Sequence, residues 1–461
     1  MNECWGKLFL LILLVGSSAL AGAALAQEAG GRLTLKEGIT IALKQNPSVT
    51  EFKERTNVAK EQIGVSRGAL LPQVGFSGTA FYGNAFTTNS AQGQGQVASV
   101  LPSATSSPNT SPGGASSLIS IPFAKNEITT FEVYRFSANQ LLFDFGKTPS
   151  QVAASKANYK KTTEDYANTR QQVVLNVRNA YFAYLASRRA IKVAEENVRQ
   201  NQELLKQANA FYNVGVRARV DVTFAESNLA NADTELIRAR NLAEISKVDL
   251  MTALGLKTWP FKDVEDTLEV TPKPLSLEEL KAQGLRQRPE LKRTFYQQQE
   301  DQANITGARA NFLPSVQGFA ARGFEGSRHE LEDQWWIGAG VNVPLFEGLS
   351  NVHTLRQARA QLRSTQANTE SVTLTVLKEV ENGYQNLKSA WEVIKSRIKA
   401  REAAAENLRL AAGRYREGVG SIIEVTDAQV RFAQADLDQV RALFDYRVAE
   451  ARLDKAVGTA F

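Results

Sequence analysis

Hydrophobic residues alternate with polar or small ones along several short segments of the chain. The clearest alternation runs from Trp335 to Leu345, where every second residue is apolar. A period of two predicts a β-strand with one apolar face, and this segment is about long enough to cross a bilayer. Weaker alternation predicts three further strands, at Gln73 to Tyr82, Phe131 to Leu142 and Ser315 to Phe324.

Two much longer stretches carry apolar residues at spacings of three, four and seven. One stripe runs from Tyr166 to Tyr212 and the other from Val376 to Tyr415. This spacing is typical of coiled-coil helices. We therefore predict helical hairpins over 149–255 and 350–457, in which the first helix of about 64 residues is about 95 Å long. Thr148 is the expected cap of that helix, with Pro149 in its first turn.

Each long helix is expected to end at a glycine that adopts the left-handed conformation. These glycines are Gly215 in the first hairpin and Gly418 in the second. The returning helix of the second hairpin begins at Ser421, and Glu424 three residues later completes the pattern of a capping box.

The chain contains an internal repeat. At an offset of 242 residues, Leu71-Pro72 matches Leu313-Pro314, and at an offset of 203 residues Tyr212 matches Tyr415. We predict a first repeat over 27–268 and a second over 269–461. Each contains a helix, two strands (315–345 in the second repeat) and a helical hairpin. The first also has a long loop over 83–128, which carries no charged residue from Gly83 to Ala124 and cannot bury a core.

The N-terminal segment has the features of a secretory signal peptide. Lys7 precedes an apolar run that is too short to span a membrane, and Ala24-Leu25-Ala26 fits a cleavage site. We expect residues 1–26 to be removed, together with Cys4, the only cysteine in the chain. The mature protein is then exported and free of thiols.

The composition argues against most catalytic and metal-binding classes. Among 461 residues there are one cysteine and two histidines, His329 and His353, which lack metal-ligand spacing, so no metal or cofactor is predicted. The net charge of +6 comes from basic residues interspersed with acids, so no nucleic-acid partner is predicted. Ser66 lies in a G-x-S-x-G pattern, but within a predicted helix and opposite Ala308 in the repeat, so we predict no enzyme.

Four strands are too few to close a membrane-spanning barrel, since known examples start near eight. An open sheet in lipid leaves about ten backbone groups unpaired on each edge, at a cost of tens of kcal/mol. We therefore expect several chains to share one barrel. The helical hairpins have charged outer faces, so they lie in water and form a tube or a bundle.

The order of these motifs resembles the TolC-like outer membrane efflux proteins. The resemblance rests on the two repeats, on Gln140 to Asp144 and Pro344 to Gly348 before the long helices, and on the Tyr-x-x-Gly-Val sequences at the hairpin turns. It implies a mainly α fold with a membrane β-barrel: a homotrimer with a 12-stranded barrel in outer-membrane lipid and an α-helical tunnel in the periplasm. It also implies a periplasmic adaptor protein and an inner-membrane transporter of the RND or ABC type as partners.

The resemblance further suggests roles for residues near the hairpin turns. Gly215, Val216, Gly418 and Val419 correspond to adaptor-docking tips, although each glycine also has an ordinary role as a helix cap.

Acidic residues that follow the turns correspond to the periplasmic entrance. Asp221, Glu424 and Asp427 would form carboxylate rings in a trimer, although acids are also favoured in a first helical turn by the helix dipole. Tyr415 is expected to hydrogen-bond Asp221 and hold the tip closed.

The sequence thus favours a passive outer-membrane exit channel for small molecules or proteins. A periplasmic or surface coiled-coil structural protein is the alternative, disfavoured because strand pairs interrupt the helical pattern at matching places. A secreted hydrolase using Ser66 is a third hypothesis. The exported cargo is left open.

Overall fold

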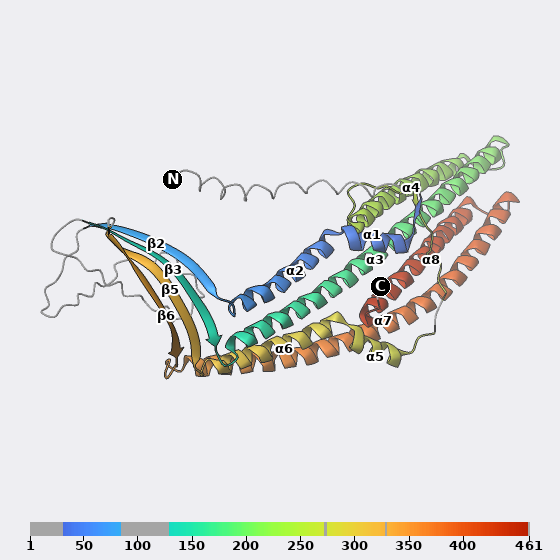
Figure 1. Ribbon diagram of the computed structural model, residues 1–461. Coiled ribbons are helices and arrows are strands. Elements are labelled where there is room, and N and C mark those ends of the chain that lie inside the picture. The colour runs from blue at the N-terminus through green and yellow to red at the C-terminus, as the bar shows by residue number, and fades with distance from the viewer. Residues whose placement is uncertain (1–30, 84–128, 272–273, 328–329, 460–461) are drawn as a thin grey trace. The chain divides into compact units, whose positions relative to one another are not determined.

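The computed structural model describes residues 31–83, 129–271, 274–327 and 330–459. The described part is mainly helical, with one four-stranded sheet and one pair of very short strands (Figure 1). The elements in chain order are β1 (Arg32–Leu33), α1 (Leu35–Gln45), α2 (Pro47–Gly68), β2 (Gln73–Gly83), β3 (Thr129–Phe143), α3 (Lys147–Asn213), α4 (Arg219–Leu254), β4 (Asp263–Val264), α5 (Leu277–Gln287), α6 (Pro289–Ala310), β5 (Ser315–Ser327), β6 (Glu330–Asn342), α7 (Ser350–Arg416) and α8 (Ile422–Val457).

The helix lengths occur in matching pairs. Helices α1 and α5 have 11 residues each, and α2 and α6 have 22 each. Helices α3 and α7 have 67 each, and α4 and α8 have 36 each. At 1.5 Å per residue, α3 and α7 are each about 100 Å long. The repeat boundaries near residue 268 stay a prediction, because the chain separates into two compact units that each take segments from both halves.

The smaller unit, residues 62–155 and 301–360, contains the sheet. Its strand order is β2-β3-β5-β6 and every neighbouring pair is antiparallel, with one irregularity of register between Leu141 and Phe143. Strands β2 and β6 lie at the two edges. Strand β6 ends at Asn342, before the predicted end at Leu345, since Pro344 has no N–H group to continue a ladder.

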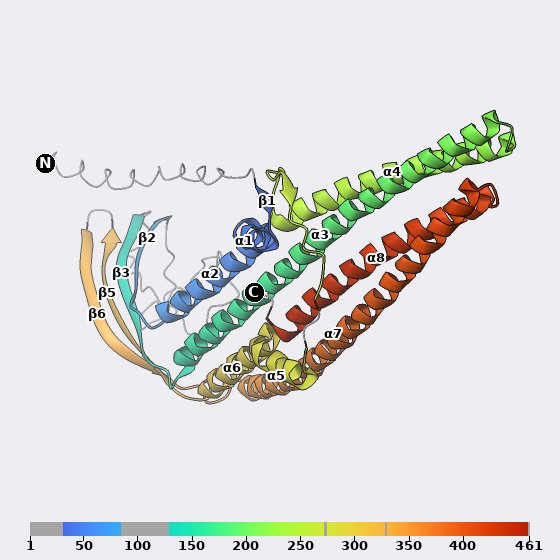
Figure 2. The same cartoon turned by 90° about the vertical axis from the view of Figure 1, so that its right-hand side faces the viewer.

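The larger unit, residues 1–61, 156–300 and 361–461, contains the two helical hairpins. In Figures 1 and 2, α4 runs back along α3, and α8 runs back along α7. The largest hydrophobic core joins both hairpins and includes Tyr181, Leu250, Val380 and Leu453. Strands β1 and β4 pair in parallel beside this core. Here Tyr181 donates its hydroxyl to the carbonyls of Leu33 and Glu265.

Two helix breaks were not predicted from the sequence. The chain breaks between α1 and α2 at Asn46, and between α5 and α6 at Arg288. A proline follows each break and occupies the first helical position of the next helix, where its missing N–H is tolerated. The residue before proline avoids helical geometry, and both Asn46 and Arg288 are extended.

Two predicted helix caps need correction. Helix α3 begins at Lys147 and not at Pro149, and Thr148 is not its cap. Instead, the backbone N–H of Thr148 donates to the carboxylate of Asp144 at 2.6 Å. At the start of α8, the Ser421 hydroxyl accepts from the Glu424 N–H, but within the described structure the Ser421 N–H does not donate in return to the Glu424 carboxylate, which lies toward Arg414.

Several predictions lie outside the described residues. These are the signal peptide over 1–26, the loop over 83–128 apart from Gly83 at the end of β2, and His329. Within the described ranges, none of the helices combines the length and the hydrophobicity that a membrane span requires.

Candidate functional site at the hairpin tips

Both hairpin turns are closed by glycines in the left-handed conformation. Gly215 has a φ of 77° and Gly418 a φ of 79°. The backbone N–H of Val216 donates to the carbonyl of Phe211, and that of Val419 to the carbonyl of Arg414. These bonds cap the ends of α3 and α7, so the predicted capping role of both glycines is confirmed.

The turns present open backbone and exposed valines. A Cβ built on Gly215 or Gly418 meets no atom within 4 Å. Val216 is 61% exposed and Val419 is 73% exposed. The capping role of the glycines does not require the neighbouring valines to be exposed. The surface formed by Val216 and Val419 is therefore available to a partner. The adaptor-docking role stays a prediction.

Behind the turns, the two hairpins share one hydrophobic core. It contains side chains from all four long helices, and its buried members are Leu204, Ala208, Val222, Ala225, Ala411, Tyr415, Ile422, Val425 and Ala428. Since these residues pack in a single cluster, the two tips of one chain form one packed unit in the structure.

Tyr415 is the largest side chain in this tip core and is completely buried. Its ring makes an edge contact with Phe211 at 5.6 Å between centroids. The predicted hydrogen bond from Tyr415 to Asp221 is not formed, because the buried Tyr415 hydroxyl has no hydrogen-bond partner in the described part of the chain. Burial, and then the charge of Asp221, raise the pKa of Tyr415 above its ordinary value, so the phenol is held neutral.

Arg217 makes a direct polar connection from the turn of the first hairpin to the turn of the second. Its Nη2 donates to the carbonyl oxygens of Gly418 at 3.1 Å and Gly420 at 2.6 Å, both in the turn of the other hairpin. Its guanidinium also lies over the Tyr415 ring, 5.5 Å from the centroid. A cation at this position is favoured by the carbonyls at the end of α7.

The three predicted entrance acids have different surroundings. Glu424 lies 3.6 Å from Arg414, and Asp427 is paired with Arg431 on its own helix at 2.7 Å. Asp221 is half-buried in the first turn of α4, near Tyr415. A single chain therefore already pairs Glu424 and Asp427 with arginines, and their role in carboxylate rings stays a prediction.

Sequence reasoning missed Arg217. At the repeat offset of 203 residues, Arg217 matches Gly420, one of the two residues whose carbonyls it contacts. A Cβ on Gly420 would lie 2.9 Å from the Tyr415 nitrogen, so only glycine fits closely there. The departure from repeat symmetry at this pair was the signal that could have indicated a special role.

The unpaired hydroxyl gives a clear expectation for Tyr415→Phe. A buried hydroxyl without a partner costs about 1–3 kcal/mol, so we expect this variant to keep the tip packed at neutral pH, with a midpoint of urea unfolding no lower than that of the parent protein. Because the pKa of Tyr415 is raised in the folded tip, the stability that the neutral phenol contributes is fully present below about pH 10 and is lost as the pH rises through the higher folded value. Alkaline loosening of the tip core should therefore occur in the parent protein and be absent in Tyr415→Phe; a lower unfolding midpoint of the variant at pH 7 would contradict this expectation.

Other sequence candidates form no site. Ser66 lies inside α2, where its Oγ is 2.7 Å from that of Ser155, and not at the strand-to-helix turn that a nucleophile elbow needs. His353 is exposed in the first turn of α7. Among the described residues, no group of three or more histidine, cysteine or acidic side chains could hold a metal ion.

The chain thus combines one antiparallel sheet of four long strands with two helical hairpins that pack together at their tips. The chain matches the family Outer membrane efflux protein over residues 38–256 and 281–459, and it belongs to this family. This membership supports the interpretation of the chain as an export channel and not the alternative of a structural coiled-coil protein. Members of this family are outer-membrane proteins.

Individual relatives are distant. The chain is 24% identical to the probable efflux pump outer membrane protein TtgC of Pseudomonas putida over 326 residues, which cover 68% of this chain and 66% of that protein. It is 22% identical to the outer membrane protein TolC of Escherichia coli, over 98% of this chain and 86% of that protein. The crystal structure of the Campylobacter jejuni CmeC outer membrane channel superimposes with a TM-score of 0.75 at 17% identity, covering 97% of this chain and 94% of that one, which shows a common fold.

Proposed function

We propose that the protein is a passive exit channel in the outer membrane, assembled from three copies of the chain. The observation that carries this proposal is the sheet of four long strands with two bare edges, β2 and β6, joined to helical hairpins with charged surfaces. In hydrocarbon, the unpaired backbone groups of both edges would each cost several kcal/mol.

Three copies remove these edges by pairing β2 of one chain with β6 of the next. The result is a closed barrel of about 12 strands, within the range of known membrane barrels. The outer face of β6 suits lipid, since Trp335, Ile337 and Val341 alternate along it and are 72%, 76% and 66% exposed. The helical hairpins of three chains then form the wall of a periplasmic tunnel.

The tips are proposed to bind a periplasmic adaptor through the exposed surface of Gly215, Val216, Gly418 and Val419. The adaptor connects the channel to an inner-membrane transporter of the RND or ABC type, which supplies the energy. Asp221, Glu424 and Asp427 are proposed to line the entrance beside these tips, with Tyr415 in the packed core behind them. Family membership and the exposed apolar turns support these assignments.

Reconstitution tests the channel. The purified protein in a planar lipid bilayer is expected to form stable conducting pores, and its mass in detergent should be that of three chains. A coiled-coil structural protein would instead remain in aqueous solution as a monomer or filament without conductance. That second result would overturn the proposal.

A further inference from the structure

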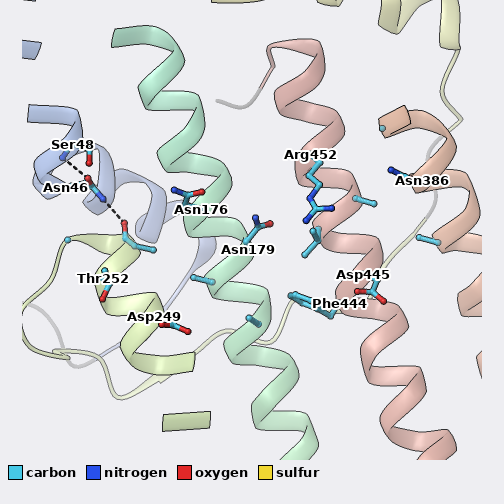
Figure 3. A pocket seen from close by; sticks show the side chains of 18 of the residues that line it. Asn46, Ser48, Asn176, Asn179, Asp249, Thr252, Asn386, Phe444, Asp445 and Arg452 are labelled. Atoms are coloured by element: carbon cyan, nitrogen blue, oxygen red, sulfur yellow. Dashed lines mark hydrogen bonds between the residues drawn. The ribbon is translucent and has the colours of Figure 1, made fainter. Parts of the chain in front are cut away.

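A shallow groove of about 1340 Å³ crosses the four long helices, within the larger unit. Figure 3 shows α4, α3, α8 and α7 in this order across the groove, with Asn179 on α3, Asp445 on α8 and Asn386 on α7. Much of the remaining lining is alanine, glycine and serine, which leaves the surface low and open.

The groove lies on the face opposite the β1–β4 strand pair and the segment that follows it. On α3, Tyr181 binds the carbonyls of Leu33 and Glu265, whereas Asn179, two residues earlier, lines the groove. On α8, Arg447 donates to the carbonyls of Thr267 and Glu269, whereas Asp445 lines the groove. Two residues correspond to about 200° around a helix, so the two sets of contacts are on opposite sides.

This arrangement indicates which side of the helices faces a tunnel. One face is covered by an additional layer of chain, which would obstruct a tunnel if it were on the inside. The other face is concave, uncovered and lined by small side chains. In a closed ring of helices, the bare concave face is the one that borders the lumen.

The groove carries charged side chains that have no ionic partner among the described residues. Within the described part of the chain, Asp249, Asp445, Lys257 and Arg452 line it and make no ion pair or hydrogen bond. On the opposite face, by contrast, Arg188 and Arg189 pair with Asp263 and Asp266. The two acids and two bases of the groove give no net charge.

Neutral amides supply the other polar groups. Asn176, Asn179 and Asn386 line the groove, and the buried Oδ1 of Asn179 has no hydrogen-bond partner among the residues that the structure describes. An amide both donates and accepts hydrogen bonds, and therefore binds polar groups irrespective of their charge.

We infer that this groove is part of the inner wall of the tunnel and forms a transit surface for small polar molecules that does not select them by the sign of their charge. The inference rests on the proposed channel function. A wall with no net charge and with amides of both hydrogen-bonding types excludes neither cations nor anions, whereas a ring of like charges selects one sign.

Cysteine labelling tests which face lines the lumen. Cys4 is the only native cysteine, so the unsubstituted protein provides the blank. Asn386→Cys, with Ser389→Cys as a second exposed groove position, is treated with methanethiosulfonate reagents during bilayer recording. The matched control is Lys192→Cys, which is exposed on the same side of α3 as Tyr181, three turns further along. Modification of the groove cysteines should lower the conductance by at least about 10%, since it narrows and charges the lumen, while modification of the control leaves it unchanged.

Comparing a cationic reagent with an anionic one tests the charge of the wall. The rates at which the two reagents modify the cysteine of Asn386→Cys, each normalised to its rate with a free thiol, should agree within about twofold. Adding Arg452→Ala should favour the cationic reagent by about three- to tenfold, because three copies lose a positive charge at the same lumen. The assignment to the inner wall is overturned if the groove cysteines do not react, or if they react without lowering the conductance. A strong preference of Asn386→Cys for reagents of one charge overturns the inference that the groove does not select by charge. If the unsubstituted protein forms no pores, the proposed function itself fails.

Discussion

Replacing Arg217 with alanine is expected to separate the two hairpin tips and to open the periplasmic end of the channel. The variant loses hydrogen bonds from a charged donor to the carbonyls of Gly418 and Gly420, and the contact with the Tyr415 ring. Allowing for partial solvent exposure, these interactions together contribute about 2–3 kcal/mol. Such a loss shifts the balance between packed and separated tips by about 30- to 150-fold.

The measurement is the open probability in bilayer recordings, together with the sensitivity of expressing cells to a large antibiotic that an intact outer membrane excludes. Arg219→Ala is the matched control, since Arg219 is exposed two residues away and makes no hydrogen bond or ion pair within the described structure. Arg217→Lys should be intermediate, because lysine keeps the charge but cannot present the planar guanidinium. If Arg217→Ala behaves like the Arg219→Ala control, Arg217 does not hold the tips.

Most of the secondary structure could be predicted from periodicity, because the pattern is local. Alternating apolar residues indicated β6, and the stripe of apolar residues from Tyr166 to Tyr212 indicated the interior of α3. The end of β6 was predicted three residues too late, because alternation alone does not detect the ladder bond that Pro344 cannot make.

Strand order and helix junctions could not be obtained in this way. The pairing of β3 with β5 joins segments more than 170 residues apart, and no local pattern encodes such a partner. Each break before Pro47 and Pro289 did have a local signal, which was the proline itself. The two breaks are then stabilised differently. Asn46 donates to the carbonyl of Ala253, whereas buried Arg288 pairs with Glu290 and Glu379.

At the candidate site, the sequence indicated the place but not all of the contacts. Gly215 and Gly418 were located correctly as caps, because a helix end has a sequence signature. The predicted hydrogen bond between Tyr415 and Asp221 was wrong, because the position of the Tyr415 hydroxyl depends on how the two hairpins pack. The same packing determines the position of Arg217, which is why only the asymmetry between the repeats could have indicated it.

The junction between α4 and α2 gives the largest expected effect on stability. Helix α4 ends at Gly255, whose φ is 76° and whose N–H donates to the carbonyls of Met251 and Thr252. A Cβ on Gly255 would lie 2.9 Å from the Cα of Asn46, at the break between α1 and α2. The obstructing atom belongs to the backbone, so no side-chain rotation can relieve the overlap.

Gly255→Ala is therefore expected to destabilise the folded chain by about 2–5 kcal/mol, combining the cost of a left-handed alanine with that of displacing the backbone at Asn46. Gly418→Ala is the matched control, because its φ is 79° but a Cβ there meets nothing within 4 Å. The control should lose only the conformational part, about 1–2 kcal/mol. The midpoint of urea unfolding, followed by circular dichroism, measures both variants under the same conditions. Equal losses in the two variants would show that the close approach between α4 and Asn46 does not limit residue size at this junction, since the left-handed conformation alone would then account for the effect.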